Sequence, residues 1–280
     1  MTESFRTQDG RTLAYRREGS GPILVCHPGG PGFSSLYLHD LAGLADTFTL
    51  VLLDPRGTGE SSTPAELRAY ATADYVSDVE ELRLHLGEEQ LNLLGHSHGG
   101  VVALAYAAEH PTRVRRCIAS HSLVRFHRDE MDQIMLRHQD EPWYDDARLA
   151  LEQEEAGAYD NEAELREITR RFWPMYFARF DERAQRYLDE CVVAERPNPE
   201  ALRVFNDGIE TWDMRPDLSR VVAPTLVLTG AEDFICGPAC AEDVAAGVAG
   251  AEKVVIDDCG HFSFVEDPAR FRHEVTRFMI

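Results

Sequence analysis

The chain has 280 residues, of which 44% are hydrophobic and 28% charged, a composition typical of a folded globular protein with a sizeable core. It excludes a disordered chain, a collagen-like repeat and a small disulfide scaffold. The 49 Asp and Glu outnumber the 28 Lys and Arg, so the net charge is −21. Because such a surface repels nucleic-acid phosphates and acidic lipid headgroups, we expect no nucleic-acid partner and no membrane partner.

Two further features concern compartment and redox state. No stretch approaches the roughly 20 apolar residues of a membrane-spanning helix, and residues 1–10 lack the apolar core of a signal peptide. We therefore expect a soluble, cytoplasmic protein. Without CxxC spacing, the cysteines are expected to be reduced thiols and not metal ligands or disulfides. They are Cys26, Cys117, Cys191, Cys236, Cys240 and Cys259.

Short apolar runs separated by helical patterns recur along the chain, which is typical of βα units around a mostly parallel sheet. Residues 5–7 and 12–16 are expected to form an opening hairpin across the turn dipeptide Asp9-Gly10. Buried strands are predicted over 23–26, 49–53, 91–94, 114–120, 225–229 and 253–256. Apolar residues spaced three and four apart predict helices over 36–45, 73–86, 101–109, 239–248 and 268–279.

One segment interrupts this alternation. Residues 123–216 show no convincing strand, but they contain acidic and Arg-rich helical stretches and all three Trp of the chain. We predict that they form a helical cap domain inserted into a core domain made of residues 1–122 and 217–280. Open α/β sheets bind ligands at the carboxyl ends of their strands, so the insertion is expected to lie over a ligand site. An enlarged core subdomain without substrate contact is the alternative.

The strongest local motif is Gly95-His96-Ser97-His98-Gly99-Gly100, a G-x-S-x-G between a predicted strand and a predicted helix. In a nucleophile elbow, small residues flank the serine because the turn is too tight for side chains, and the hydroxyl stands exposed above the sheet. Since strand, turn and helix occur in the required order, Ser97 is the candidate nucleophile.

A serine nucleophile needs a base and an acid that orients the base, in the chain order Ser, acid, His for this type of elbow. The strand at 225–229 is followed by Glu232 and Asp233, and the last strand is followed by His261. Both groups should therefore reach the sheet edge that carries Ser97. We predict His261 as the base and Asp233 as the acid, with Glu232 as the rival acid.

The segment His27-Pro28-Gly29-Gly30-Pro31-Gly32 follows another strand and is nearly free of side chains. Backbone amides there can approach a substrate, so those of Gly30 and His98 are the candidate oxyanion donors. The segment has neither a Walker sequence nor a GxGxxG fingerprint, which argues against a phosphate site.

Three histidines around the elbow raise the possibility of a metal site. His96, His98 and His121 could be interpreted as ligands, but the backbones of the first two are needed to build the elbow. We therefore predict no metal site and no cofactor.

With these motifs in place, the sequence resembles the α/β-hydrolase superfamily and, within it, the proline iminopeptidase-like serine peptidases. The marks are Gly29-Gly30-Pro31-Gly32, the segment Asp54-Pro55-Arg56-Gly57-Thr58-Gly59-Glu60-Ser61, the elbow and Gly260-His261. The resemblance implies an α/β-hydrolase fold, with a mostly parallel central sheet flanked by helices and a helical cap insertion. It also implies Ser97 as nucleophile, Asp233 as acid and His261 as base, with oxyanion amides at Gly30 and His98.

The same resemblance guides the substrate hypothesis. Those peptidases bind the substrate's free ammonium through glutamates of the cap; here the motifs around them do not match, and Glu210 is a candidate by composition only. Trp173 and Trp212 of the cap are further candidates for substrate contact. In the family's place for a loop histidine this chain has Pro28, and His98 stands where an aromatic residue is usual.

We therefore hypothesise a serine hydrolase that acts through an acyl-enzyme on a small molecule, with a proline iminopeptidase-like aminopeptidase or amidase as the leading hypothesis. A carboxylesterase or lactonase acting on a neutral small molecule is the alternative. A hydrolase-fold binding protein without catalysis is a third hypothesis, from another class. The sequence leaves the oligomeric state open.

Overall fold

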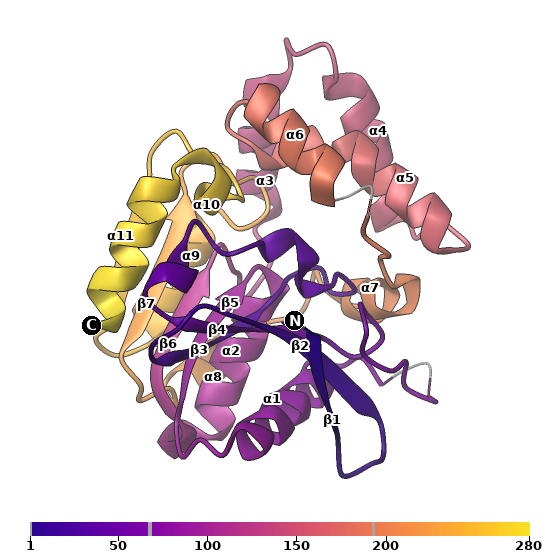
Figure 1. The fold of residues 1–280 in the computed structure, drawn as a ribbon. Coiled ribbons are helices and arrows are strands. Elements are labelled where there is room, and N and C mark those ends of the chain that lie inside the picture. Colours follow the sequence, from indigo (N-terminus) through magenta and orange to yellow (C-terminus); the bar gives the residue numbers. More distant parts are fainter. Residues whose placement is uncertain (1, 67–68, 192–193) are drawn as a thin grey trace.

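The computed structural model describes residues 2–66, 69–191 and 194–280, and its strands form one sheet (Figure 1). The strands are β1 (Thr2–Arg6), β2 (Thr12–Glu18), β3 (Ile23–His27), β4 (Thr49–Asp54), β5 (Leu91–His96), β6 (Val114–Ser120), β7 (Thr225–Gly230) and β8 (Glu252–Ile256). Their spatial order is β1-β2-β4-β3-β5-β6-β7-β8. Only the pairs β1 with β2 and β2 with β4 are antiparallel in this described sheet, which confirms the predicted opening hairpin and mostly parallel sheet.

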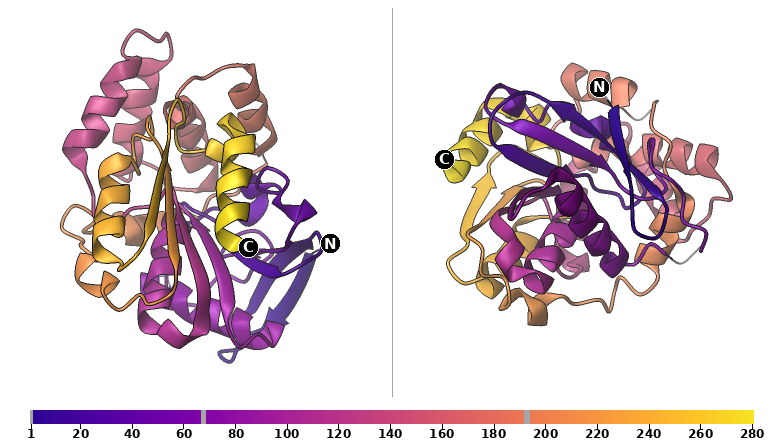
Figure 2. Two further views of the ribbon diagram at one scale, coloured as in Figure 1. Left: turned by 90° about the vertical axis from the view of Figure 1, so that its left-hand side faces the viewer. Right: turned by 60° about the horizontal axis from the view of Figure 1, so that its bottom comes forward.

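Helices cover both faces of the sheet. Successive strand residues point to opposite faces, so strands buried on both sides show continuous apolar runs. In β4, Val51 packs on one face and Leu52 on the other. The first face carries α1 (Thr72–Leu86), α2 (His98–Glu109), α8 (Arg215–Leu218) and α9 (Pro238–Gly247), and the second carries α10 (Ser263–Glu266) and α11 (Pro268–Met279). Figure 2 shows α9 and α11 on opposite sides of the strands.

The helix predicted over residues 36–45 is wrong. This segment forms two 3-10 turns, Ser35–Leu38 and Leu44–Asp46, and Leu41 between them has a φ of 50°. Leu38, Leu41 and Leu44 are all fully buried. The spacing of three residues between these leucines therefore predicted the buried side chains correctly. The left-handed backbone between the two turns, however, does not allow a continuous α-helix.

The segment 54–61, which carried part of the family resemblance, forms the loop after β4. The Arg56 guanidinium donates from Nε and Nη2 to the Asp78 carboxylate on α1, at 2.7 and 2.8 Å, and both side chains are buried. The Asp54 carboxylate accepts from the backbone amides of Ser35 and Glu60. The motif thus ties β4 to α1 and to the segment after β3.

Between β6, which ends at Ser120, and β7, which begins at Thr225, lies a helical insertion, of which residues 192 and 193 lie outside the described part. It contains α3 (Arg128–Met135), α4 (Tyr144–Glu155), α5 (Glu162–Phe172), α6 (Glu182–Cys191) and α7 (Pro199–Asn206). Apolar side chains of α3, α4 and α5 form a separate core cluster that also includes Phe234, which follows β7. Those of α6 pack instead into the cluster on the second face of the sheet. In Figure 1, α4, α5 and α6 lie together at the top, away from α1 and α2.

Two general features complete the fold. None of the described helices is long and apolar enough to cross a membrane. The six cysteines are all buried as free thiols, as expected from their spacing. Burial raises the pKa of Cys117 to about 12, so this thiol stays protonated and behaves as a small apolar group.

Candidate active site

Ser97 stands at the tight turn between β5 and α2. Its φ of 56° and ψ of −124° place it in a backbone conformation that non-glycine residues rarely adopt. The Ser97 amide donates to the Ser120 carbonyl at 2.9 Å, which fixes the turn to the neighbouring strand β6. His96 and His98 on either side are buried, whereas Ser97 keeps part of its surface exposed. The turn therefore presents one hydroxyl to the space above the sheet.

Neighbouring backbone segments approach the glycines of this turn so closely that a side chain would not fit. A Cβ on Gly95 would lie 2.0 Å from the Gly99 carbonyl oxygen, and a Cβ on Gly99 would lie 2.1 Å from that of His27. A Cβ on Gly29 would lie 2.5 Å from the Ser97 Cβ. The structure therefore bears out the steric reason for small residues in the elbow, and it places the 27–32 loop directly against Ser97.

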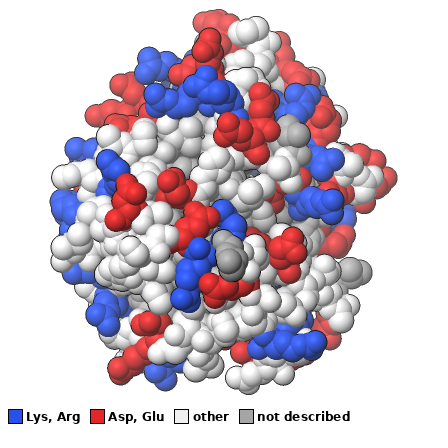
Figure 3. All heavy atoms as spheres, viewed as in Figure 1, with Lys and Arg blue, Asp and Glu red and all other residues white. Residues whose placement is uncertain are grey.

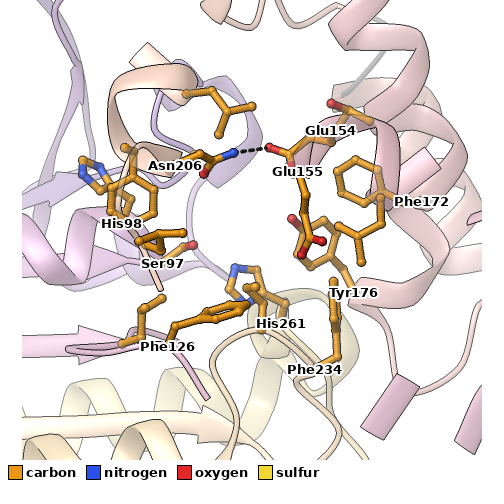
Figure 4. A pocket seen from close by; sticks show the side chains of 18 of the residues that line it. Ser97, His98, Phe126, Glu154, Glu155, Phe172, Tyr176, Asn206, Phe234 and His261 are labelled. Carbon is orange, nitrogen blue, oxygen red and sulfur yellow. Dashed lines mark hydrogen bonds between the residues drawn. The ribbon is translucent and has the colours of Figure 1, made fainter. Parts of the chain in front are cut away.

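His261 and Asp233 meet at the predicted sheet edge. His261 Nδ1 lies 2.8 Å from Asp233 Oδ2, and the Asp233 side chain is completely buried. The other oxygen, Oδ1, accepts from the backbone amides of Ile235 and Cys236 at 3.2 and 2.9 Å. Figure 4 shows the His261 ring directed towards Ser97.

Electrostatics keep the Asp233 carboxylate charged. Burial by itself raises its pKa, but the electrostatic effect of the adjacent His261 ring, the hydrogen bond from that ring and the Cys236 backbone amide outweigh burial, so the pKa is lowered. The rival acid Glu232 faces elsewhere and pairs with Arg137. Of the two carboxylates left open by the sequence, the structure brings Asp233 to His261.

The two residues that carry the candidate oxyanion amides line the same cavity. Gly30 and His98 line it together with Ser97. His98 is the first residue of α2, so its N–H has no acceptor within the helix. Within the described residues, neither the Gly30 nor the His98 amide has a hydrogen-bond acceptor. Two amide donors are therefore available beside the serine.

The cavity above Ser97 has a volume of about 490 Å³, within the usual range for small-molecule sites. The sheet contributes Ser97 and His261, and the helical insertion contributes residues of α4, α5, α7 and the 3-10 turn Trp173–Tyr176. Its aromatic lining residues are Phe33, Tyr37, Phe126, Phe172, Trp173, Tyr176, Phe205, Phe234 and Phe262. Such walls favour a substrate that is largely apolar around its reacting group.

Two neighbouring acidic residues that the sequence analysis missed, Glu154 and Glu155, line this cavity, and Glu155 is paired with Arg128 at 2.8 Å. Glu154 of α4 is half-buried, and its carboxylate accepts from Asn206 Nδ2 at 3.1 Å (Figure 4). Loss of solvent raises its pKa to about 7, despite the opposing effect of the Asn206 hydrogen bond. In the sequence it sits within Gln153-Glu154-Glu155, where nothing distinguishes it from the exposed glutamates nearby. Only the packing of α4 against α7 reveals it.

The three residues predicted to contact substrate lie at different positions relative to the cavity. Trp173 lines the cavity, and its ring stacks on Phe262 at 5.1 Å between centroids. Glu210 lies at the rim with its side chain 75% exposed, 3.7 Å from Arg128. Trp212 is not among the described lining residues. Its ring packs instead against Phe205, which does line the cavity, so direct contact between Trp212 and substrate is not supported.

One group of side chains around His261 has the residue types of a metal site. Asp233, Cys236 and His261 each place a potential ligand atom within 4.8 Å of the others. Burial raises the pKa of the Cys236 thiol well above its usual range, so no thiolate forms there. Both Asp233 oxygens already accept hydrogen bonds. These groups suit acid–base chemistry better than metal binding.

The fold and the profile of the sequence define the class of protein. The chain belongs to the α/β hydrolase fold family, whose profile matches residues 22–268. It is similar to a proline iminopeptidase from Pestalotiopsis fici, 27% identical over 268 residues, which cover 92% of each chain. A proline iminopeptidase from Saccharolobus solfataricus is 27% identical over 275 residues, 95% of this chain and 87% of the relative. The chain is thus an α/β hydrolase that is similar to proline iminopeptidases, as the resemblance implied.

Solved structures agree with this assignment. A hydrolase from Pseudomonas aeruginosa PA01 matches with a TM-score of 0.75 and 27% identity, over 99% of this chain and 98% of that one. An enol-lactonase from Burkholderia xenovorans LB400 has the same fold, with a TM-score of 0.72 and 22% identity over 99% of both chains. Proteins of this fold therefore carry more than one hydrolytic activity, and the substrate must be argued from the site.

Proposed function

We propose that this protein is a serine hydrolase in which Ser97 is the nucleophile, His261 the general base and Asp233 the acid that orients the base. The observation that carries the proposal is the His261 ring, held at Nδ1 by the buried Asp233 carboxylate at 2.8 Å and directed towards Ser97. A hydrogen bond to Nδ1 leaves the lone pair on Nε2, the nitrogen that faces the serine. Serine–histidine contacts of this kind often tighten only when substrate binds.

The proposed reaction has two steps. His261 Nε2 takes the Ser97 proton while Oγ attacks the substrate carbonyl, and the Gly30 and His98 amides stabilise the oxyanion. His261 then gives the proton to the leaving amine or alcohol, which leaves an ester on Ser97. Water, deprotonated by His261, hydrolyses this ester and restores the free hydroxyl. No redox step occurs and no cofactor is needed.

For the substrate, we propose a small amide with a free amino terminus, held under the helical insertion, which acts as a cap. Glu154 supports this choice, because within the described residues its carboxylate has an amide partner, Asn206, but no cationic one. A substrate ammonium can supply the missing positive charge. Glu154 replaces Glu210 as the main candidate for this contact, since Glu210 is exposed and near Arg128.

A neutral ester or lactone is the second candidate substrate. It is favoured by the aromatic walls of the cavity and by the Glu154 pKa of about 7, because the protonated side chain leaves this part of the cavity uncharged. The two candidates differ in whether hydrolysis requires the free amine.

The test compares the wild-type protein with Ser97→Ala on prolyl and alanyl p-nitroanilides, on their N-blocked forms and on p-nitrophenyl butyrate. Ser77→Ala is the matched control, because Ser77 is exposed on α1 and its hydroxyl bonds only within that helix. We expect Ser97→Ala to lose at least about 1000-fold in kcat and Ser77→Ala to keep wild-type activity. Cleavage of free but not blocked anilides supports the aminopeptidase, and cleavage of the ester alone supports the second candidate. A Ser97→Ala protein as active as wild type would exclude the mechanism.

A further inference from the structure

A chain of buried hydrogen bonds lies beneath the site and connects its three loops. The Gly29 amide donates to the Tyr37 hydroxyl at 2.5 Å, and this hydroxyl lies 2.8 Å from His96 Nδ1. His96 Nε2 lies 2.8 Å from the backbone carbonyl of His261. Tyr37 and His96 are 4% and 1% exposed, so water does not compete for these contacts. None of these groups has a part in the proposed proton transfers.

The chemistry of the terminal groups determines which atom donates and which accepts in each hydrogen bond of this chain. A carbonyl oxygen only accepts, so His96 Nε2 must carry the hydrogen that bonds to His261. Burial lowers the pKa of His96 well below its usual range, so the ring is neutral and Nδ1 is an acceptor. The Tyr37 O–H therefore donates to Nδ1, which leaves its oxygen free to accept from Gly29. One tautomer and one hydroxyl orientation satisfy all the groups.

Each member of the chain lies next to a group that the proposed mechanism uses. Gly29 precedes Gly30, His96 precedes Ser97, and the bonded carbonyl belongs to His261 itself. The rings are packed as well as bonded, because His96 stacks on Phe262 at 5.5 Å and lies 4.7 Å from the His261 ring. A shift in any one loop would therefore break a hydrogen bond between buried groups.

We propose that Tyr37 and His96 are positioning residues that set the spacing between the oxyanion amide of Gly30, the nucleophile Ser97 and the base His261. This inference rests on the proposed function. The pair does not touch the substrate's reacting atoms through its hydrogen-bonding groups. It acts through the backbones of the three loops, so its loss lowers transition-state stabilisation more than substrate binding.

The first test is Tyr37→Phe, which removes one hydroxyl and keeps the ring. We expect kcat to fall about 10- to 100-fold with KM within about twofold, since removal of one oxyanion donor costs about 100- to 1000-fold and its displacement costs less. Affinity for a boronic acid, which forms a tetrahedral adduct on the serine, should fall by a similar factor. The matched control is Tyr106→Phe, a buried tyrosine on α2 whose hydroxyl bonds Glu80 away from the cavity. It should lower the melting temperature without changing kcat.

A second set of variants separates positioning from stability. His96→Gln can donate to the His261 carbonyl and accept from Tyr37, so it should retain more kcat than His96→Leu. Tyr37→Phe combined with His96→Leu should be no slower than His96→Leu alone, because the two residues act through one chain. If the kcat losses of Tyr37→Phe and His96→Leu multiplied in the double variant, the inference would be overturned. A Tyr37→Phe protein with wild-type kcat and boronate affinity would also overturn it. If wild type itself shows no Ser97-dependent hydrolysis and no fluorophosphonate adduct on Ser97, the proposed function fails and the inference falls with it.

Discussion

At the scale of single residues, Glu154 is a cavity carboxylate whose charge changes near neutral pH. Its pKa of about 7 means that the carboxylate ionises near neutral pH, while a peptide α-amino group loses its proton near about 8. An ion pair between them is therefore strongest in a narrow range between these values. In that range the site can distinguish a free amino terminus from a blocked one.

The first prediction concerns this pH dependence. For free-amino anilides, KM should fall as pH rises from 6 to about 7.5, because deprotonation of Glu154 creates the anchor for the ammonium. Glu154→Gln should raise KM about tenfold at pH 7.5 and abolish this fall. Glu152→Gln, an exposed position on the same helix paired with Arg148, is the control and should behave as wild type. An unchanged KM in Glu154→Gln would remove Glu154 from substrate recognition.

The same group gives a prediction on stability that is independent of catalysis. Since the folded pKa is raised from 4.5 to about 7, the native state holds a proton that the unfolded state releases, so stability decreases as pH rises between these values. Glu154→Gln should therefore be more stable than wild type at pH 8, by about 1–3 kcal/mol, and about equal at pH 4.5. Urea unfolding at the two pH values measures the difference. Equal stability at pH 8 would show that the carboxylate is well solvated.

At the scale of elements, the loop after β4 depends on a buried ion pair. Arg56 is bonded by Asp78 through two hydrogen bonds, and Arg11, just before β2, donates to the same carboxylate at 2.9 Å. Asp74, one turn earlier on α1, also contacts Arg56 at 3.2 Å but is 35% exposed. The family-like segment is thus a structural connection between the sheet and α1, and its residues are not part of the cavity lining found in the described structure.

These two aspartates give a matched comparison. Asp78→Ala leaves the Arg56 charge buried without its main partner and should lower the free energy of unfolding by about 3–5 kcal/mol. Asp74→Ala loses a partly exposed contact and a helix cap and should cost about 1 kcal/mol. Urea denaturation of both variants measures the difference. Equal losses would contradict the central role assigned to Asp78.

At the scale of the whole molecule, the net charge of −21 affects how substrates arrive. Figure 3 shows acidic side chains interleaved with Lys and Arg on the face in view, so the excess charge is not one patch there. The field of the whole protein nevertheless attracts cations and repels anions. Salt screens this attraction, with a Debye length of about 10 Å at 0.1 M.

This leads to a prediction on ionic strength. For a free-amino anilide, kcat/KM should fall severalfold between 20 and 500 mM NaCl at pH 7.5, whereas for p-nitrophenyl butyrate it should stay within about twofold. The neutral ester is the internal control for general effects of salt on the enzyme. A parallel response of both substrates would mean that long-range attraction of the ammonium does not contribute.

The sequence by itself determined the fold, the candidate nucleophile Ser97, the candidate base His261 and the strand after which the acid follows. Strand–turn–helix order around Ser97 and the strands before Asp233 and His261 are local patterns, and parallel strands bring their carboxyl ends to one edge. The helix predicted around Leu41 was wrong, because apolar periodicity indicates which side chains are buried and not whether the backbone between them is right-handed.

Only the tertiary structure decided the contacts between segments distant in the chain. In the structure Asp233, and not Glu232, contacts His261. Glu154 lines the cavity, whereas Trp212 does not. Hydrogen bonds connect Gly29, Tyr37, His96 and His261 in one chain. The physical reason is that burial and hydrogen bonding depend on what packs against a residue, and neighbours in sequence do not specify those partners. Local pattern thus fixes which groups reach the sheet edge, and packing fixes what each group can do there.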